Sequence, residues 1–199
     1  MVVKLGIPQI RYEVESLTRM LLGETPVTVV LPEETVPDDN DMITVTEEPE
    51  ENGVLCRVRT LLGGKMQESV RLCADDSAQK EQAVCRIIYD QLTVLLGHSL
   101  PWGMLTGVRP VKLVRQMTEA GLTEAEITQK LTDYGVSEER LRLSLDTWHN
   151  QKEIIEGLAP DKVSLYVAIP FCPSRCSYCS FVSNDTARWG HMIEPYVQA

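Results

Sequence analysis

Basic residues are scarce in this sequence of 199 residues. Lys and Arg number 19 against 29 Asp and Glu, so the net charge is −10 and the pI is about 4.8. This balance disfavours non-specific binding to nucleic acid or to anionic membranes. An apolar run of the roughly 20 residues that a bilayer span needs is absent, and no secretory signal opens the chain. The sequence therefore predicts a cytoplasmic protein with no nucleic-acid partner and no membrane span.

The six cysteines are not expected to form disulfides. In a reducing compartment they are expected to be ligands or core residues. Cys56, Cys73 and Cys85 are scattered along the chain, and we interpret them as small, buried hydrophobic residues without a function. The other three cluster near the end of the sequence.

Residues 1–98 predict an α+β domain with one or two helices packed on a sheet. Gly63-Gly64 separates two extended runs, which indicates a tight hairpin that places Arg59 opposite Glu68. The acidic run 47–52 is expected to be a solvated turn. The elements expected here are a helix over 10–21, strands over 27–31, 42–46, 54–62 and 65–73, and a long helix that carries an apolar stripe over 84–95 and ends at Gly97.

Residues 99–159 predict a helical segment with three helices. Pro110 suits the first position of the first helix. Thr123 and Glu126 have the spacing of a capping box at the start of the second helix, and Ser137 opens the third. These helices are interpreted as scaffold.

The character of the chain changes over residues 160–199. The run 163–169 is apolar throughout, which is typical of a strand covered on both faces, as in an α/β barrel. It leads directly into a cysteine-rich loop, and residues 186–197 are expected to form the helix that follows. The predicted fold class is α/β overall, ending in the first βα unit of a barrel whose active site lies at the carboxyl ends of the strands.

The loop carries Cys172, Cys176 and Cys179 with the spacing C-x3-C-x2-C. Three thiolates at this spacing are able to hold three irons of a [4Fe-4S] cluster and leave the fourth iron open for chemistry. Zinc bound by the same cysteines and His191 is the main alternative, because zinc is usually bound by four ligands in a tetrahedron. A redox dithiol and three unrelated cysteines are two further alternatives.

The stretch from Leu165 through Phe181 resembles the signature of radical S-adenosylmethionine enzymes, and more narrowly the oxygen-independent coproporphyrinogen III oxidase group. The stretch from Leu100 to Pro110 and the long leader are similar to the HemZ-type branch, coproporphyrinogen dehydrogenases. The resemblance implies a radical-SAM (TIM-like) barrel and a [4Fe-4S] cluster on the three cysteines. It also implies S-adenosylmethionine as cofactor and a porphyrinogen substrate, whose propionates are converted to vinyl groups in haem biosynthesis. A reductant protein such as flavodoxin or ferredoxin is the implied electron donor.

The same resemblance places Tyr166 at the S-adenosylmethionine site and Tyr178 beside a second S-adenosylmethionine. Two positions depart from the oxidase pattern: Phe181 stands where those enzymes have a fourth cysteine, and Ala168 where they have histidine. A Phe at this position also occurs in the related haem-chaperone branch, so a haem-binding role on the same fold is a second hypothesis. No catalytic residue is assigned.

The expected barrel needs more residues than the sequence provides after Pro160. A barrel needs roughly 200 or more residues, whereas about 40 follow Pro160. We therefore expect the chain to be an N-terminal fragment with domains 1–98, 99–159 and 160–199. On its own it is expected to be inactive, with a labile cluster.

Overall fold

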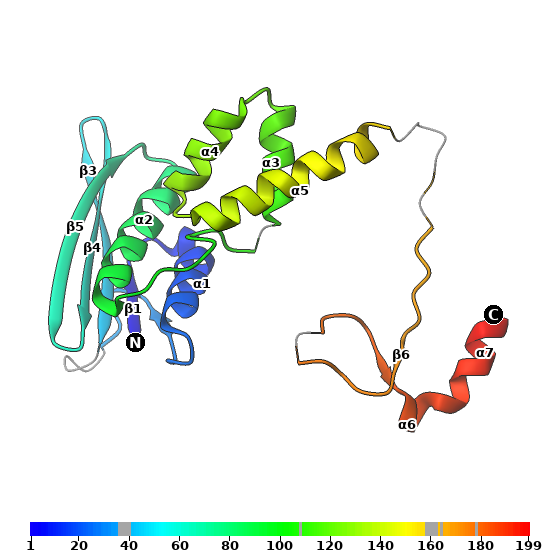
Figure 1. Ribbon diagram of the computed structural model, residues 1–199. Helices are drawn as coiled ribbons and strands as arrows, with labels where there is room; N and C mark the ends of the chain where they lie inside the picture. Colours follow the sequence, from blue (N-terminus) through cyan, green and yellow to red (C-terminus); the bar gives the residue numbers. More distant parts are fainter. Residues whose placement is uncertain (36–40, 108, 158–162, 164, 178) are drawn as a thin grey trace. The chain divides into compact units, whose positions relative to one another are not determined.

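The computed structural model describes residues 1–35, 41–107, 109–157, 163, 165–177 and 179–199 (Figure 1). They form two compact units, Met1–Ile155 and Glu156–Ala199. The α/β composition is confirmed, because a five-stranded sheet is combined with helices. The expected domain borders after residues 98 and 159 stay predictions. Among the residues that the structure describes, no helix is both long enough and apolar enough to cross a membrane.

The sheet of the first unit has the strand order β2-β1-β3-β4-β5. Strand β1 runs parallel to both of its neighbours, β2 and β3, whereas β3, β4 and β5 form an antiparallel meander. Its strands are β1 (Val2–Leu5), β2 (Thr28–Val30), β3 (Met42–Glu50), β4 (Gly53–Leu62) and β5 (Lys65–Cys73).

The hairpin predicted around Gly63-Gly64 is confirmed. Both glycines have positive φ, 56° and 75°, which a tight two-residue turn requires of its central residues. The register is also as predicted, because Arg59 lies opposite Glu68 and its Nε donates a hydrogen bond of 2.8 Å to Glu68 Oε2. The local turn therefore sets the alignment of β4 and β5.

The expected acidic turn over 47–52 is wrong, since β3 continues to Glu50 and only Glu51 and Asn52 form the turn. Pro49 is compatible with a strand here because of its direction in the ladder. The Gly6 N–H donates to the Val45 C=O, so odd-numbered residues of β3 turn their backbone groups away from β4. The N–H that Pro49 lacks is therefore not needed for pairing with β4.

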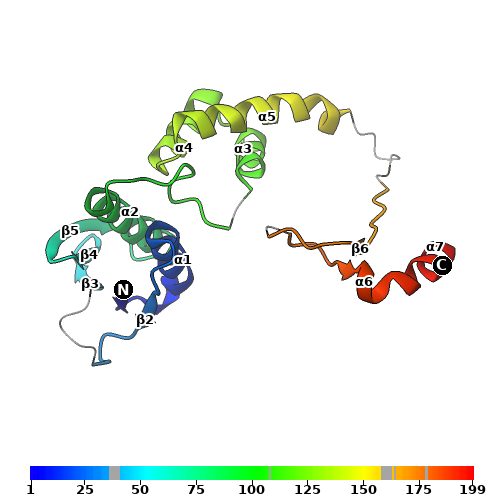
Figure 2. The same cartoon turned by 60° about the horizontal axis from the view of Figure 1, so that its bottom comes forward.

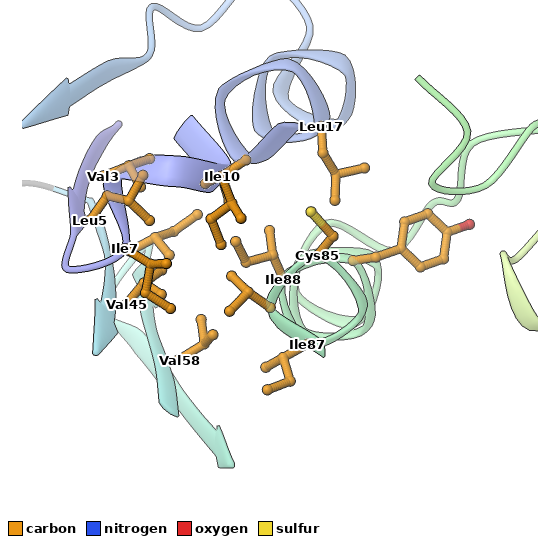
Figure 3. Packing of buried hydrophobic residues seen from close by; sticks show 14 of the residues in the cluster. Val3, Leu5, Ile7, Ile10, Leu17, Val45, Val58, Cys85, Ile87 and Ile88 are labelled. Atoms are coloured by element: carbon orange, nitrogen blue, oxygen red, sulfur yellow. The ribbon is translucent and has the colours of Figure 1, made fainter. Parts of the chain in front are cut away.

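Two helices, α1 (Arg11–Leu22) and α2 (Ser77–Leu96), pack on one face of this sheet. Alternate strand residues supply the sheet side of the core, while helical residues such as Leu17 and Ile88 supply the other (Figure 3). Full burial of side chains of this size contributes about 1.5–3 kcal/mol each. Gly97 ends α2 in the left-handed conformation, as expected from its position after the apolar stripe.

A second core is formed by α3 (Pro110–Glu119), α4 (Glu124–Asp133) and α5 (Glu138–Glu156). The capping box of α4 is confirmed: the Thr123 N–H donates to Glu126 Oε2 at 2.8 Å, and the Glu126 N–H donates to Thr123 Oγ1 at 3.3 Å. The loop before α3 joins the two cores, because the Met104 N–H donates to the Tyr134 C=O at 2.8 Å. Figure 2 shows α3, α4 and α5 as a separate group of helices.

In the second unit, the strand expected over 163–169 is wrong for the residues described there. Residues 163 and 165–169 form neither helix nor strand, and Val163 is 92% exposed. A strand requires a neighbour to pair with, and none of the described strands lies beside this segment. The start of a barrel is thus not confirmed. The expected helix over 186–197 is present in interrupted form, as α6 (Thr186–Trp189), the 3-10 helix η2 (Gly190–Met192) and α7 (Ile193–Gln198).

Candidate metal centre

The three clustered cysteines all lie in the second unit, at or within one loop. Cys172 is the last residue of β6 (Phe171–Cys172), and Cys176 and Cys179 follow in the loop that leads to β7 (Asn184–Asp185). All three are free thiols; Cys176 is exposed, and Cys172 and Cys179 are partly buried. They are therefore accessible to metal, in contrast to the buried Cys56 and Cys85 of the first unit.

The two ends of the loop are held together by β6 and β7. These short strands pair in parallel, with Cys172 opposite Asp185. Asn184 reinforces the closure, because its backbone N–H and its side-chain amide both donate to the Pro170 C=O, at 2.7 Å and 3.2 Å. Cys172 consequently lies at a fixed point where the loop begins.

The segment after the loop packs back on β6. Asp185 caps α6 by accepting a hydrogen bond of 2.8 Å from the Ala187 N–H. The Tyr196 ring lies edge-on to Phe171 with 5.6 Å between ring centroids, and its hydroxyl donates to the Ala168 C=O. We did not identify Asn184, Asp185 or Tyr196 from the sequence. The Asp-Thr pair before a helix is a capping signal that indicates Asp185, but no local pattern indicates the other two.

Inside the loop, a turn joins the second and third cysteines. The Cys179 N–H donates to the Cys176 C=O at 3.0 Å, and Arg175 donates to the Cys179 C=O at 3.4 Å. Within the described ranges, however, no three His, Cys, Asp or Glu side chains are close enough together to hold a metal ion. The backbone brings the cysteines into one loop but does not bring the three sulfur atoms to one point.

The donor set fits an iron–sulfur cluster chemically, since such clusters are held by cysteine thiolates. It fits zinc less completely. His191, the fourth ligand in that alternative, lies in η2 and stacks on Trp189 with 6.1 Å between ring centroids. Because the residues described include no metal-binding group with His191 either, geometry does not separate the two interpretations, and the cysteine ligands stay a prediction.

Of the two tyrosines predicted at the cofactor site, only Tyr166 is among the residues that the structure describes. Tyr166 is 78% exposed and belongs to the segment without regular structure. Tyr178 lies outside the described residues. Both assignments stay predictions.

The scattered cysteines occupy a different chemical environment. Burial raises the pKa of the Cys56 thiol and of the Cys85 thiol to about 12 in each case. Both are protonated at neutral pH and are therefore poor metal ligands. Cys56 Sγ also lies 3.7 Å from Cys73 Sγ, which is a contact between thiols. The interpretation of Cys56 and Cys85 as buried core residues is confirmed, while Cys73 is partly buried.

Comparison with known proteins returns a relative of the expected kind. The chain is 32% identical over 127 residues to the oxygen-independent coproporphyrinogen-III oxidase-like protein HemZ of Bacillus subtilis (strain 168). The matched region covers 59% of this chain and 25% of that protein. The chain thus spans about a quarter of the length of this relative. No family model matches the chain, and no solved structure matches it.

Proposed function

We propose that this chain, which is related to the oxygen-independent coproporphyrinogen-III oxidase-like protein HemZ, carries the cluster-binding loop of a radical S-adenosylmethionine oxidoreductase. The observation that carries the proposal is the set of three free, accessible thiols at C-x3-C-x2-C spacing in the loop between β6 and β7. Because the chain spans about a quarter of its relative, the reaction is proposed for the whole protein.

Cys172, Cys176 and Cys179 would hold three irons of a [4Fe-4S] cluster. When bound, the cluster supplies an iron without a protein ligand, where S-adenosylmethionine binds, and the electron for the cleavage of that cofactor. The parallel pair β6–β7 fixes Cys172, and the hydrogen bond from the Cys179 N–H to the Cys176 C=O holds the backbones of the other two cysteines in one turn. Tyr166 and Tyr178 are the proposed contacts to S-adenosylmethionine.

The proposed reaction is the oxidative decarboxylation of coproporphyrinogen III propionates to vinyl groups in haem biosynthesis. A flavodoxin or ferredoxin is the proposed electron donor, and the cytoplasm the proposed location. In the full-length protein under anaerobic conditions, cleavage of S-adenosylmethionine should depend on reductant and should accompany formation of the vinyl product. Cleavage of the cofactor without any vinyl product would contradict the proposed substrate.

The metal centre itself can be tested on this chain. After anaerobic reconstitution with iron and sulfide, we expect about four of each per chain. Replacing any of Cys172, Cys176 or Cys179 by Ala should remove more than half of both. Cys73→Ala is the matched control, because it also deletes a partly buried thiol but should leave the iron and sulfide unchanged. Equal iron loss in the control, or full iron content in all three variants, would refute the assignment.

A haem-binding role on the same fold is the second proposal, and it rests on Phe181. This apolar side chain is 72% exposed in the cysteine loop, where it is able to contact a flat aromatic ring. Titration with haem should then show saturable binding that Phe181→Ser weakens at least about tenfold. Binding that Phe181→Ser leaves unchanged would remove this proposal, while zinc without sulfide in the isolated chain would favour a zinc-binding module.

A further inference from the structure

The outer strand of the sheet, β5, has an open edge. It is last in the strand order, opposite the short strand β2, and Figure 1 shows no described element beyond it. Three of its apolar side chains are strongly exposed: Met66 is 65%, Val70 49% and Leu72 54% exposed. A long edge strand with exposed apolar residues is a template for pairing with another strand.

The hairpin turn determines which residues of β5 face this edge. The pair next to a two-residue turn, Leu62 and Lys65, exchanges hydrogen bonds, and such pairs alternate along an antiparallel ladder. Odd-numbered residues of β5 therefore pair with β4. The even-numbered residues turn their N–H and C=O groups outward, and no bond from these groups to another described element is found. These outward residues are Met66, Glu68, Val70 and Leu72.

We propose that two copies of this chain associate through β5, antiparallel, about a two-fold axis at Ser69. In this register Met66 pairs with Leu72 of the second copy, and Glu68 pairs with Val70. Every outward N–H and C=O of these residues then finds a partner, because all the pairs join even-numbered residues. A second copy is the occupant because the strand is complementary to itself in this register.

The side chains support the same register. Met66 meets Leu72, so the exposed apolar groups cover each other. Glu68 meets uncharged Val70, while its own charge is already balanced by Arg57 at 2.8 Å and Arg59 at 2.7 Å within the chain. No two like charges lie directly opposite each other across the two-fold axis.

Neighbouring registers are less favourable. A shift that moves the axis to Glu68 places the two Glu68 carboxylates opposite each other and leaves Leu72 facing the Gly63-Gly64 turn. A shift that moves the axis to Val70 leaves Met66 beyond the end of the partner strand. The axis at Ser69 is the register in which the whole strand is used.

Substitutions of opposite charge at Val70 test the pairing. Val70→Glu adds two symmetry-related contacts between carboxylates, with Glu68 of each copy, and should weaken dimerisation at least about tenfold. Val70→Lys should strengthen it, because each Lys meets Glu68 of the other copy. Within one chain Val70 lies opposite Arg57, so the stability of the monomer should change in the reverse direction. Sedimentation of the 199-residue chain over roughly 1–200 µM measures the dimer. A wild-type chain that stays monomeric throughout, or equal effects of both variants, would overturn the proposal.

Cross-linking tests the register independently. At a two-fold axis through a non-hydrogen-bonded pair, the two Ser69 Cα atoms lie about 4.5 Å apart, which a disulfide can span. Ser69→Cys should therefore form a covalent dimer when oxidised glutathione takes up the electrons of the two thiols. Gln67→Cys is the matched control on the same face, because its two copies lie about 14 Å apart. Equal cross-linking of both variants, or none for Ser69→Cys, would refute the register.

Discussion

A buried polar network between α2 and the sheet gives the sharpest test of the first unit. Thr60 is fully buried on β4, and Gln91 of α2 is 3% exposed. The Thr60 hydroxyl donates to Gln91 Oε1 at 2.7 Å, and Gln91 Nε2 donates to the Val58 C=O at 3.2 Å and to Ser69 Oγ at 3.1 Å. The Thr60 hydroxyl and the Gln91 amide oxygen depend on each other, because both side chains are buried.

Gln91→Leu should destabilise the chain by about 2 kcal/mol. The Thr60 hydroxyl would lose its acceptor, which costs about 1–3 kcal/mol for a buried group, while the larger apolar surface of Leu offsets a part. Thr60→Val should cost about 1–2 kcal/mol, because it leaves the amide oxygen of Gln91 without a donor. The double variant removes both polar groups, so its loss should be smaller than the sum of the two by about 1–2 kcal/mol.

Urea unfolding followed by circular dichroism measures these differences as changes in midpoint at constant slope. Gln82→Leu is the matched control, since Gln82 is exposed on the same helix and its replacement should stay within about 0.5 kcal/mol. Strictly additive losses in the double variant would refute the reasoning. A Gln91→Leu chain as stable as the wild type would do the same.

Four further predictions concern single features of the fold. Gly103 has a φ of +58°, and a Cβ there would lie 2.1 Å from the Tyr134 carbonyl oxygen, so Gly103→Ala should cost at least about 3 kcal/mol in urea unfolding. Thr123→Ala should cost about 1 kcal/mol by the loss of its cap. Hydrogen bonds from Thr123 hold the pKa of Glu126 below its usual value, so the stability that this carboxylate contributes is present above about pH 4.3 and is lost as the pH falls through the lowered pKa. The difference between wild type and Glu126→Gln should accordingly shrink on acidification, and a difference that grows would contradict it. Backbone amides of 165–169 should exchange with solvent far faster than those of β4, and equal protection would show a paired strand.

The elements predicted correctly from the sequence are those whose cause is local. Gly63 and Gly64 set the turn of the hairpin by their positive φ, and the turn then fixes the register of two strands. The capping box at Thr123 likewise depends on residues within one helical turn. The turn predicted over 47–50 is wrong because acidic residues and Pro are unfavourable for strands only on average. The pairing of this run with β4 outweighs that preference.

The candidate site divides in the same way. The spacing of Cys172, Cys176 and Cys179 is a property of the sequence, so the loop could be predicted from it, while the assignment of these cysteines as metal ligands stays a prediction. Closure of the loop depends on Asn184 and Tyr196, which contact Pro170 and Ala168 across a gap in the sequence. Such contacts have no local signature in the sequence, because it is the fold that brings the Asn or Tyr side chain to a distant hydrogen-bond partner.

The segment 163–169 shows most clearly what composition leaves undetermined. Its β-branched and apolar residues favour an extended backbone by up to about 1 kcal/mol each, whereas ordering each residue costs about 1–2 kcal/mol. Hydrogen bonds to a neighbouring strand must supply the difference. β4 gains two such neighbours from adjacent sequence through two-residue turns. A parallel neighbour requires a much longer connection, and β7, which does run parallel in this unit, pairs with β6 instead. The apolar pattern therefore identifies a segment able to form a strand, and pairing decides whether the strand forms.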